Sequence, residues 1–100
     1  MAYDPGALNA SLSAAVGSDP ELVAELRAAF IDSATRQTDL MGRARCDDNW
    51  LLAAARLKSI AASFGALGLL ELADEAIEGA PGDPVVLRKI RLSLNDFTSI

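Results

Sequence analysis

The sequence predicts an all-α fold: an antiparallel up-down four-helix bundle with a short additional N-terminal helix, in one domain over residues 1–100. Alanine and leucine dominate the apolar residues and aromatic residues make up only 5%, a composition that favours helices. No segment alternates apolar and polar residues over the length of a strand. Stretches rich in Gly, Pro and Asp divide the chain into five helix-like segments. Four amphipathic helices joined by short links bury their apolar stripes most economically side by side.

The first segment, around residues 8–16, is short, and we expect it to pack across one end of the bundle. The second spans about residues 21–45 and begins with strong helix-start signals, with Ser18 or Asp19 as the N-cap and Pro20 in the first turn. Spacings of three and four residues predict one buried stripe on this long helix. The stripe comprises Leu22, Leu26, Ala29, Phe30, Ser33, Gln37 and Leu40.

The third segment spans about residues 48–64, with Asp47 or Asp48 as its cap, and Gly65 is expected to end it and to lie close to the fourth segment. Asp83 and Pro84 start the last segment as Asp19 and Pro20 start the second. The expected buried stripes are Trp50, Ala54, Leu57, Ala61 and Phe64 in the third segment, Leu69, Leu70, Ala73 and Ile77 in the fourth, and Leu87, Ile90, Leu94 and Phe97 in the fifth.

Composition excludes several classes of function. The net charge is −5 and no basic run is present, which excludes nucleic acid as a partner. No apolar stretch is long enough to span a membrane and no signal-peptide pattern is evident, so we expect a cytoplasmic protein. The chain has one cysteine and no histidine, so it has no internal disulfide, no histidine-based metal site and no histidine-activated nucleophile. We therefore expect no enzyme activity and no cofactor, and we expect a monomer.

The third segment has an unusual outward side. At about 100° per residue, this side lies roughly 80–200° from the buried stripe. It carries small and apolar residues around one lysine, where a solvated helix normally carries charged residues. This pattern predicts a docking face for another protein, comprising Leu51, Leu52, Ala55, Lys58, Ser59 and Ala62. Helix propensity in an alanine-rich chain, with Leu51 packed against the first helix, is an alternative explanation.

Residues 55–66, "ARLKSIAASFGA", resemble the signature of histidine-containing phosphotransfer (HPt) domains, which reads His-x-Leu-Lys-Gly, a small-residue stretch, and then Gly-Ala. The wider arrangement agrees over about residues 8–97, with Phe30 near the middle of the long second helix. The positions that match the signature are Leu57, Lys58, Ala61, Ala62, Gly65 and Ala66.

The chain departs from this signature at two positions. The phosphoacceptor histidine falls on Ala55 and the following glycine falls on Ser59. A methyl group cannot accept a phosphoryl group, so the phosphorelay chemistry is absent. The resemblance implies that Lys58 matches a lysine that helps to neutralise phosphoryl or receiver-carboxylate charge. It implies docking to a response-regulator receiver domain or a histidine kinase.

Three interpretations follow. The first is a degenerate, non-catalytic HPt-like docking or regulatory module of a two-component phosphorelay. The second is an engineered His→Ala variant, at Ala55, of an active phosphotransfer protein, although Ser59 favours natural drift because an engineer had no reason to change the glycine. The third is a helical protein-interaction bundle unrelated to phosphorelay.

Overall fold

The computed structural model describes residues 5–17 and 19–98, which form five helices and no strand. The helices are α1 (Pro5–Val16), α2 (Pro20–Arg43), α3 (Asp47–Phe64), α4 (Leu67–Glu78) and α5 (Pro84–Thr98). The prediction of an all-α chain is therefore confirmed for the described residues, and the helix boundaries differ from the expected ones by a few residues. None of the described helices combines the length and the apolar character needed to cross a membrane.

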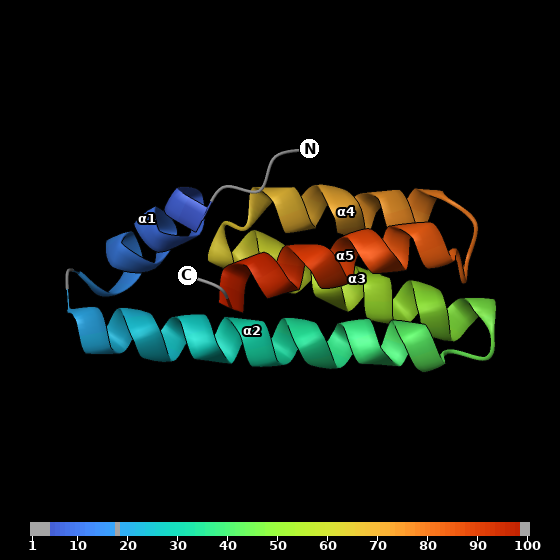
Figure 1. The fold of residues 1–100 in the computed structure, drawn as a ribbon, viewed down its shortest axis with the longest axis horizontal. Coiled ribbons are helices and arrows are strands. Elements are labelled where there is room, and N and C mark those ends of the chain that lie inside the picture. Colours follow the sequence, from blue (N-terminus) through green and yellow to red (C-terminus); the bar gives the residue numbers. More distant parts are fainter. Residues whose placement is uncertain (1–4, 18, 99–100) are drawn as a thin grey trace.

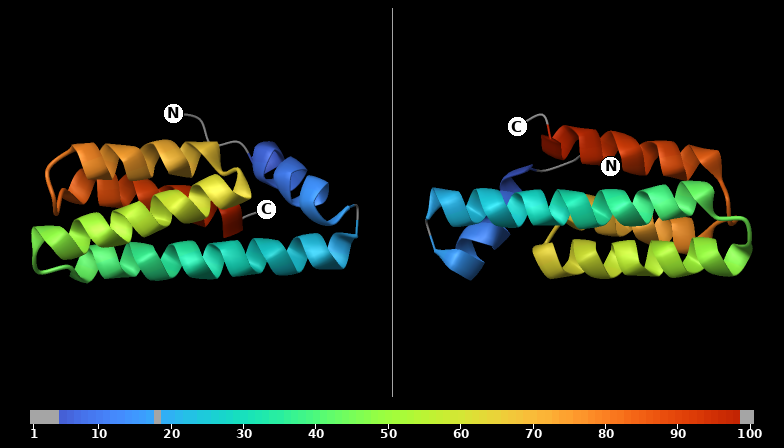
Figure 2. Two further views of the ribbon diagram at one scale, coloured as in Figure 1. Left: turned by 180° about the vertical axis from the view of Figure 1, so that it is seen from behind. Right: turned by 90° about the horizontal axis from the view of Figure 1, so that it is seen from below.

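Helices α2 to α5 lie side by side along the long axis of the molecule, and each runs opposite to the one before it (Figures 1 and 2). Helix α2 packs against α3 and α5, and α4 packs against the same two helices, so their apolar stripes face a shared interior. Helix α1 lies obliquely against α2 and α3 at the end where α2 begins and α3 ends (Figure 1). It buries Leu8 and Leu12 there.

Aromatic rings link three of the helices through the interior. The Phe30 ring of α2 is fully buried, and its centroid lies 5.2 Å from the Phe64 ring of α3 and 5.2 Å from the Phe97 ring of α5. Trp50 of α3 donates an indole N–H bond of 3.2 Å to the carbonyl of Ala76 in α4. Ring pairs at such separations stabilise a core beyond the area that they bury, by about 0.5–1.5 kcal/mol each.

Two of the predicted helix starts are confirmed. The Asp19 carboxylate accepts a 3.0 Å bond from the Glu21 backbone N–H, and the Asp83 carboxylate accepts a 2.9 Å bond from the Val85 N–H. Ser18, the other candidate cap, lies outside the described residues.

The predicted cap of α3 is wrong. Cys46 is the N-cap and makes no side-chain bond, while Asp47 and Asp48 lie in the first turn. Carboxylates at these positions still stabilise the helix, because the N-terminal end of a helix carries a partial positive charge.

The predicted stripe of α2 is partly wrong. Leu22 and Leu40 are 43% and 39% exposed, and Ala29 is also exposed. The buried line on this helix is instead Phe30, Ala34, Thr38 and Met41. Thr38 can be buried because its hydroxyl donates a 2.8 Å bond to the Ala34 carbonyl. The stripes of the other helices are buried or half-buried as predicted.

Candidate functional site

The candidate site is the outward side of α3. The inward residues Trp50, Ala54, Leu57 and Ala61 are buried, so the helix presents its opposite side to solvent. We call Leu51, Leu52, Ala55, Lys58, Ser59 and Ala62 the α3 face. All of these residues are exposed except Leu51, which is half-buried and packs against the core. Leu52 keeps 51% of its surface exposed, which leaves an apolar side chain beside a row of small residues.

Leu51 does not pack against the first helix. It lies near the N-terminus of α3, whereas α1 lies against the other end of that helix (Figure 1). This position argues against the alternative explanation, and the half-burial of Leu51 comes from its packing against the core.

Lys58 lies on the side of α3 that faces α4. Its ammonium Nζ lies 2.7 Å from Asp74 Oδ1 on α4, and both side chains remain close to half exposed. The hydrogen bond and the charge of Asp74 raise the pKa of Lys58, and the charge of Glu78 adds to this. Lys58 therefore carries a positive charge at neutral pH, and a partner's anion has to compete with Asp74 for it.

The acidic residues of α4 fall into two pairs by their contacts. Asp74 pairs with Lys58, and Glu75 pairs with Lys89 of α5 at 3.4 Å, whereas Glu71 and Glu78 are exposed and form no ion pair with another described residue. Two of these four acidic residues thus form ion pairs that link α4 to α3 and α5. No group of three metal-ligating side chains occurs in the part of the chain that the structure describes.

Ala55 occupies an exposed position at the middle of the α3 face. Its methyl group has neither a lone pair nor a proton to exchange, so it offers no nucleophile. The hydroxyls of Ser59 and Ser63 are exposed nearby, but the described residues of α3 include no histidine or paired base to activate them.

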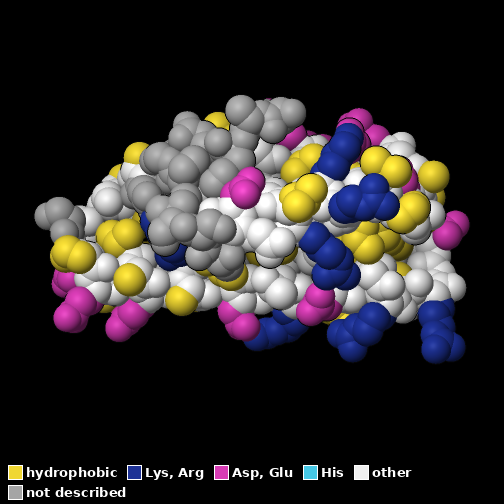
Figure 3. All heavy atoms as spheres, viewed as in Figure 1, with side chains coloured by type: hydrophobic (Ala, Val, Ile, Leu, Met, Phe, Trp, Pro, Cys, Tyr) yellow, Lys and Arg dark blue, Asp and Glu magenta, His cyan; other side chains and the backbone are white. Residues whose placement is uncertain are grey.

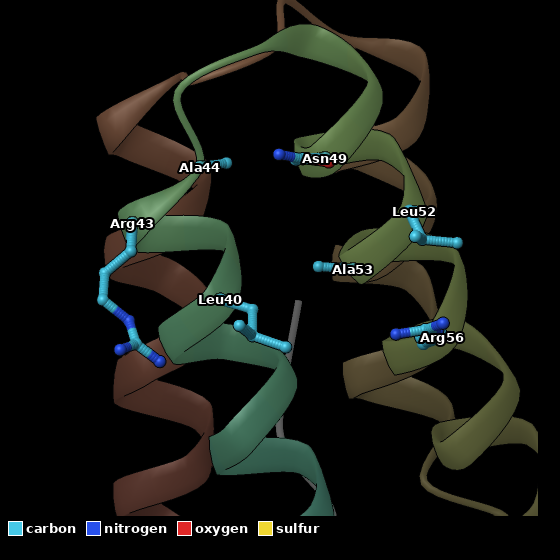
Figure 4. Close-up of a pocket in the computed structure, with 7 residues that line it drawn as sticks. All are labelled: Leu40, Arg43, Ala44, Asn49, Leu52, Ala53 and Arg56. Carbon is cyan, nitrogen blue, oxygen red and sulfur yellow. The ribbon is translucent and has the colours of Figure 1, made fainter.

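A hollow of about 410 Å³ separates the end of α2 from the start of α3, beside the α3 face. Leu40, Asn49 and Ala53 point into the space between the two helices, with Arg43 at the outer edge of α2 and Leu52 at the outer edge of α3 (Figure 4). Arg56 lines the same hollow. The predicted face therefore continues across α3 toward α2.

A second, shallower hollow of about 410 Å³ adjoins the first, since Arg56 lines both. It is formed by Gln37 of α2 with Ala55, Ser59 and Ile60 of α3. The Gln37 Oε1 atom is buried and has no hydrogen-bond partner among the described residues. A buried oxygen without a hydrogen bond lowers the stability of the fold, and a hydrogen-bond donor that reaches it removes this penalty.

The sequence analysis missed Leu40, Arg43 and Arg56 as parts of this surface. Leu40 was assigned to the buried stripe of α2, and neither arginine stood out by spacing. A helical projection of α3 does place Arg56 beside Leu52, which lies four residues earlier and about 40° away. Only the packing of α2 against α3 brings Arg43 and Arg56 to one hollow.

Gly65 also has a different neighbour from the one expected. Gly65 ends α3, as predicted, and adopts a left-handed conformation with φ 71°. A Cβ atom at this position would collide with Ser11 of α1. The close approach is therefore between the end of α3 and α1.

A basic surface lies on α5, apart from the α3 face. Lys and Arg side chains gather there among hydrophobic ones on the face shown in Figure 3. Lys89 and Arg91 are ion-paired with Glu75 and Asp39, at 3.4 and 3.1 Å, whereas Arg88 has no ion pair with a described residue. Most of the charge on this surface is thus neutralised within the molecule.

Comparison of the chain with protein-family models, with curated proteins and with solved structures found no match. The function is therefore argued from the residues of this chain and their geometry.

Proposed function

We propose that this chain is an HPt-like four-helix bundle, with α1 as an accessory helix, that docks other signalling proteins without transferring a phosphoryl group. The partner is a response-regulator receiver domain or a histidine kinase, and the contact surface is the α3 face. The role is that of a regulatory or adaptor module of a two-component phosphorelay.

The exposure of the α3 face is the observation that carries this proposal. Ala55, Ser59 and Ala62 are exposed along one side of α3, with the 51% exposed Leu52 beside them. Small side chains let another backbone approach closely, and an exposed leucine gives that approach an apolar contact. A solvated helix of ordinary composition would carry charged residues there.

The lack of a transferable group supports a non-catalytic role. The position that matches the phosphoacceptor holds the Ala55 methyl group, and the chain contains no histidine. A partner that docks on this surface therefore meets no nucleophile, and its phosphoryl group stays where it is. Occupation of the partner's docking surface would then compete with a functional phosphotransfer protein.

A binding screen against the receiver and kinase domains of the same genome tests the proposal. Titration calorimetry with Ala55→Trp is expected to lose binding, because an indole ring blocks close approach to α3. Ala28→Trp, the same change at an exposed alanine of α2, serves as the matched control and should bind as the unmodified chain does. Unchanged affinity of Ala55→Trp would contradict the proposal.

The screen also separates the two alternatives. A helical interaction protein unrelated to phosphorelay would bind none of these domains. An engineered variant would bind them, and the gene would encode histidine at position 55.

A further inference from the structure

The hollow between α2 and α3 combines two exposed leucines with two arginines. Leu40 and Leu52, 39% and 51% exposed, line it from opposite helices. Other large apolar side chains are exposed elsewhere, but these two border one concave space of about 410 Å³. A space of this kind accepts an apolar side chain of a partner.

The two arginines of this hollow form no ion pair with a described residue, whereas four other cations of the described chain do. Arg36, Lys58, Lys89 and Arg91 each lie within 4 Å of a carboxylate on the same or a neighbouring helix. Arg43 donates to the Asp39 backbone carbonyl, at 3.4 Å, and neither Arg43 nor Arg56 forms an ion pair with a described residue.

The residues that line the two adjoining hollows include these two arginines and no carboxylate. Arg45, on the loop that joins the helices, also makes no ion pair with a described residue. Asp47 and Asp48, in the first turn of α3, follow Arg45 closely in the chain and offset its charge, so the positive charge at the hollows comes from Arg43 and Arg56.

We propose that the α2–α3 hollow binds an acidic and apolar segment of the partner, with an apolar side chain packed on Leu40 inside the hollow and on Leu52 at its outer edge, and a carboxylate held by Arg56 and by Arg43 at the edge of α2. Guanidinium groups suit this task because they stay charged and present several N–H donors to a carboxylate. The inference rests on the proposed function, since it specifies the chemistry by which the partner is recognised there.

A synthetic helical peptide with leucine and glutamate on one face serves as the probe, together with a second peptide that carries glutamine in place of glutamate. The ¹⁵N-labelled full chain is titrated with each peptide and followed by NMR. The glutamate peptide is expected to shift the amide signals of Leu40, Ala53 and Arg56, and its affinity is expected to fall as salt is added, because exposed charges are screened. The glutamine peptide is expected to bind about tenfold more weakly.

Arg43→Gln/Arg56→Gln is the test variant and Arg88→Gln is the matched control, since Arg88 is also exposed and without an ion pair but lies on α5. The double variant should bind the glutamate peptide about tenfold more weakly, whereas Arg88→Gln should stay within about twofold of the unmodified chain. Circular dichroism melting of each variant shows that it folds.

Absence of shifts at the hollow, or equal affinity of the double variant and the control, would overturn the inference. These results do not depend on the receiver and kinase screen. That screen can fail while the peptide binds, and the peptide can fail while a receiver binds, so the two proposals fail separately.

Discussion

At the scale of single residues, position 55 determines what the α3 face can do. Ala55 is exposed where the HPt signature has a histidine, so the surface is available while the reactive nitrogen is absent. The sequence was sufficient to predict this difference from the HPt signature. It was insufficient to identify the partner of Lys58, because Lys58 and Asp74 belong to different helices and meet only through packing.

The first prediction concerns phosphoryl transfer. A receiver domain phosphorylated on its aspartate with labelled acetyl phosphate should transfer no label to this chain. Ala55→His should become labelled, because its imidazole nitrogen can attack the phosphorus and displace the aspartate carboxylate. Gel autoradiography reads both results. A labelled band on the unmodified chain would show that another residue accepts the group.

A second prediction follows from the ion pair between Lys58 and Asp74. The hydrogen bond and charge of Asp74 raise the pKa of Lys58 in the folded chain above its unfolded value of about 10.4. The ion pair therefore stabilises the fold at neutral pH, and this contribution is lost as the pH rises through the folded pKa of Lys58. The free energy of unfolding of the unmodified chain should exceed that of Asp74→Asn at pH 7, and the difference should shrink above about pH 10.

Asp32→Asn provides the control for this titration. Asp32 pairs with Arg36 at 2.6 Å, and an arginine stays charged at every pH in the experiment. The difference that Asp32→Asn causes should therefore stay constant with pH. Parallel behaviour of the two variants above pH 10 would show that Lys58 does not titrate against Asp74.

At the scale of helices, the sequence predicted where each element lies but not how neighbouring elements meet. Asp19 with Pro20, Asp83 with Pro84, and Gly65 predicted three boundaries because caps and left-handed turns are local features. Cys46 was missed as a cap because two acids follow it directly. The α2–α3 hollow was missed because it depends on the register of two helices.

A third prediction tests the contact between α1 and the end of α3. Gly65→Ala should lower the free energy of unfolding by about 1–2 kcal/mol, because alanine is strained in the left-handed conformation. A further loss is expected because the new Cβ would lie 2.9 Å from Ser11 Cβ, which side-chain rotation cannot move away. Gly82 has φ 83°, and a Cβ atom there would have nothing within 4 Å, so Gly82→Ala should lower the free energy of unfolding by only the strain term of about 1–2 kcal/mol. Urea unfolding measures both variants.

Hydrogen exchange of the same variants locates the effect. Gly65→Ala should speed exchange in α1, because this helix has to move away from the new methyl group. Equal unfolding free energies for the two variants, with unchanged exchange in α1, would contradict the described position of that helix.

At the scale of the whole molecule, the interior fixes the orientation of the α3 face. The contact of Phe30 with Phe64 and Phe97, and the bond from Trp50 to Ala76, set the rotation of α3 about its axis. Ala55 and Ser59 therefore point outward. The stripe of α3 was predicted correctly because large residues mark it, whereas the stripe of α2 was misjudged because Ala34 and Thr38 carry no strong apolar signal.

The central claim is that a signalling partner docks on the α3 face. NMR titration of the ¹⁵N-labelled chain with a receiver or kinase domain from the binding screen tests it most directly. The account predicts that the largest amide shifts fall on Leu52, Ala55, Ser59 and Ala62, while Arg88 and Leu92 on α5 stay unshifted. Shifts centred on α4 and α5, or no shift with any receiver or kinase domain, would contradict it.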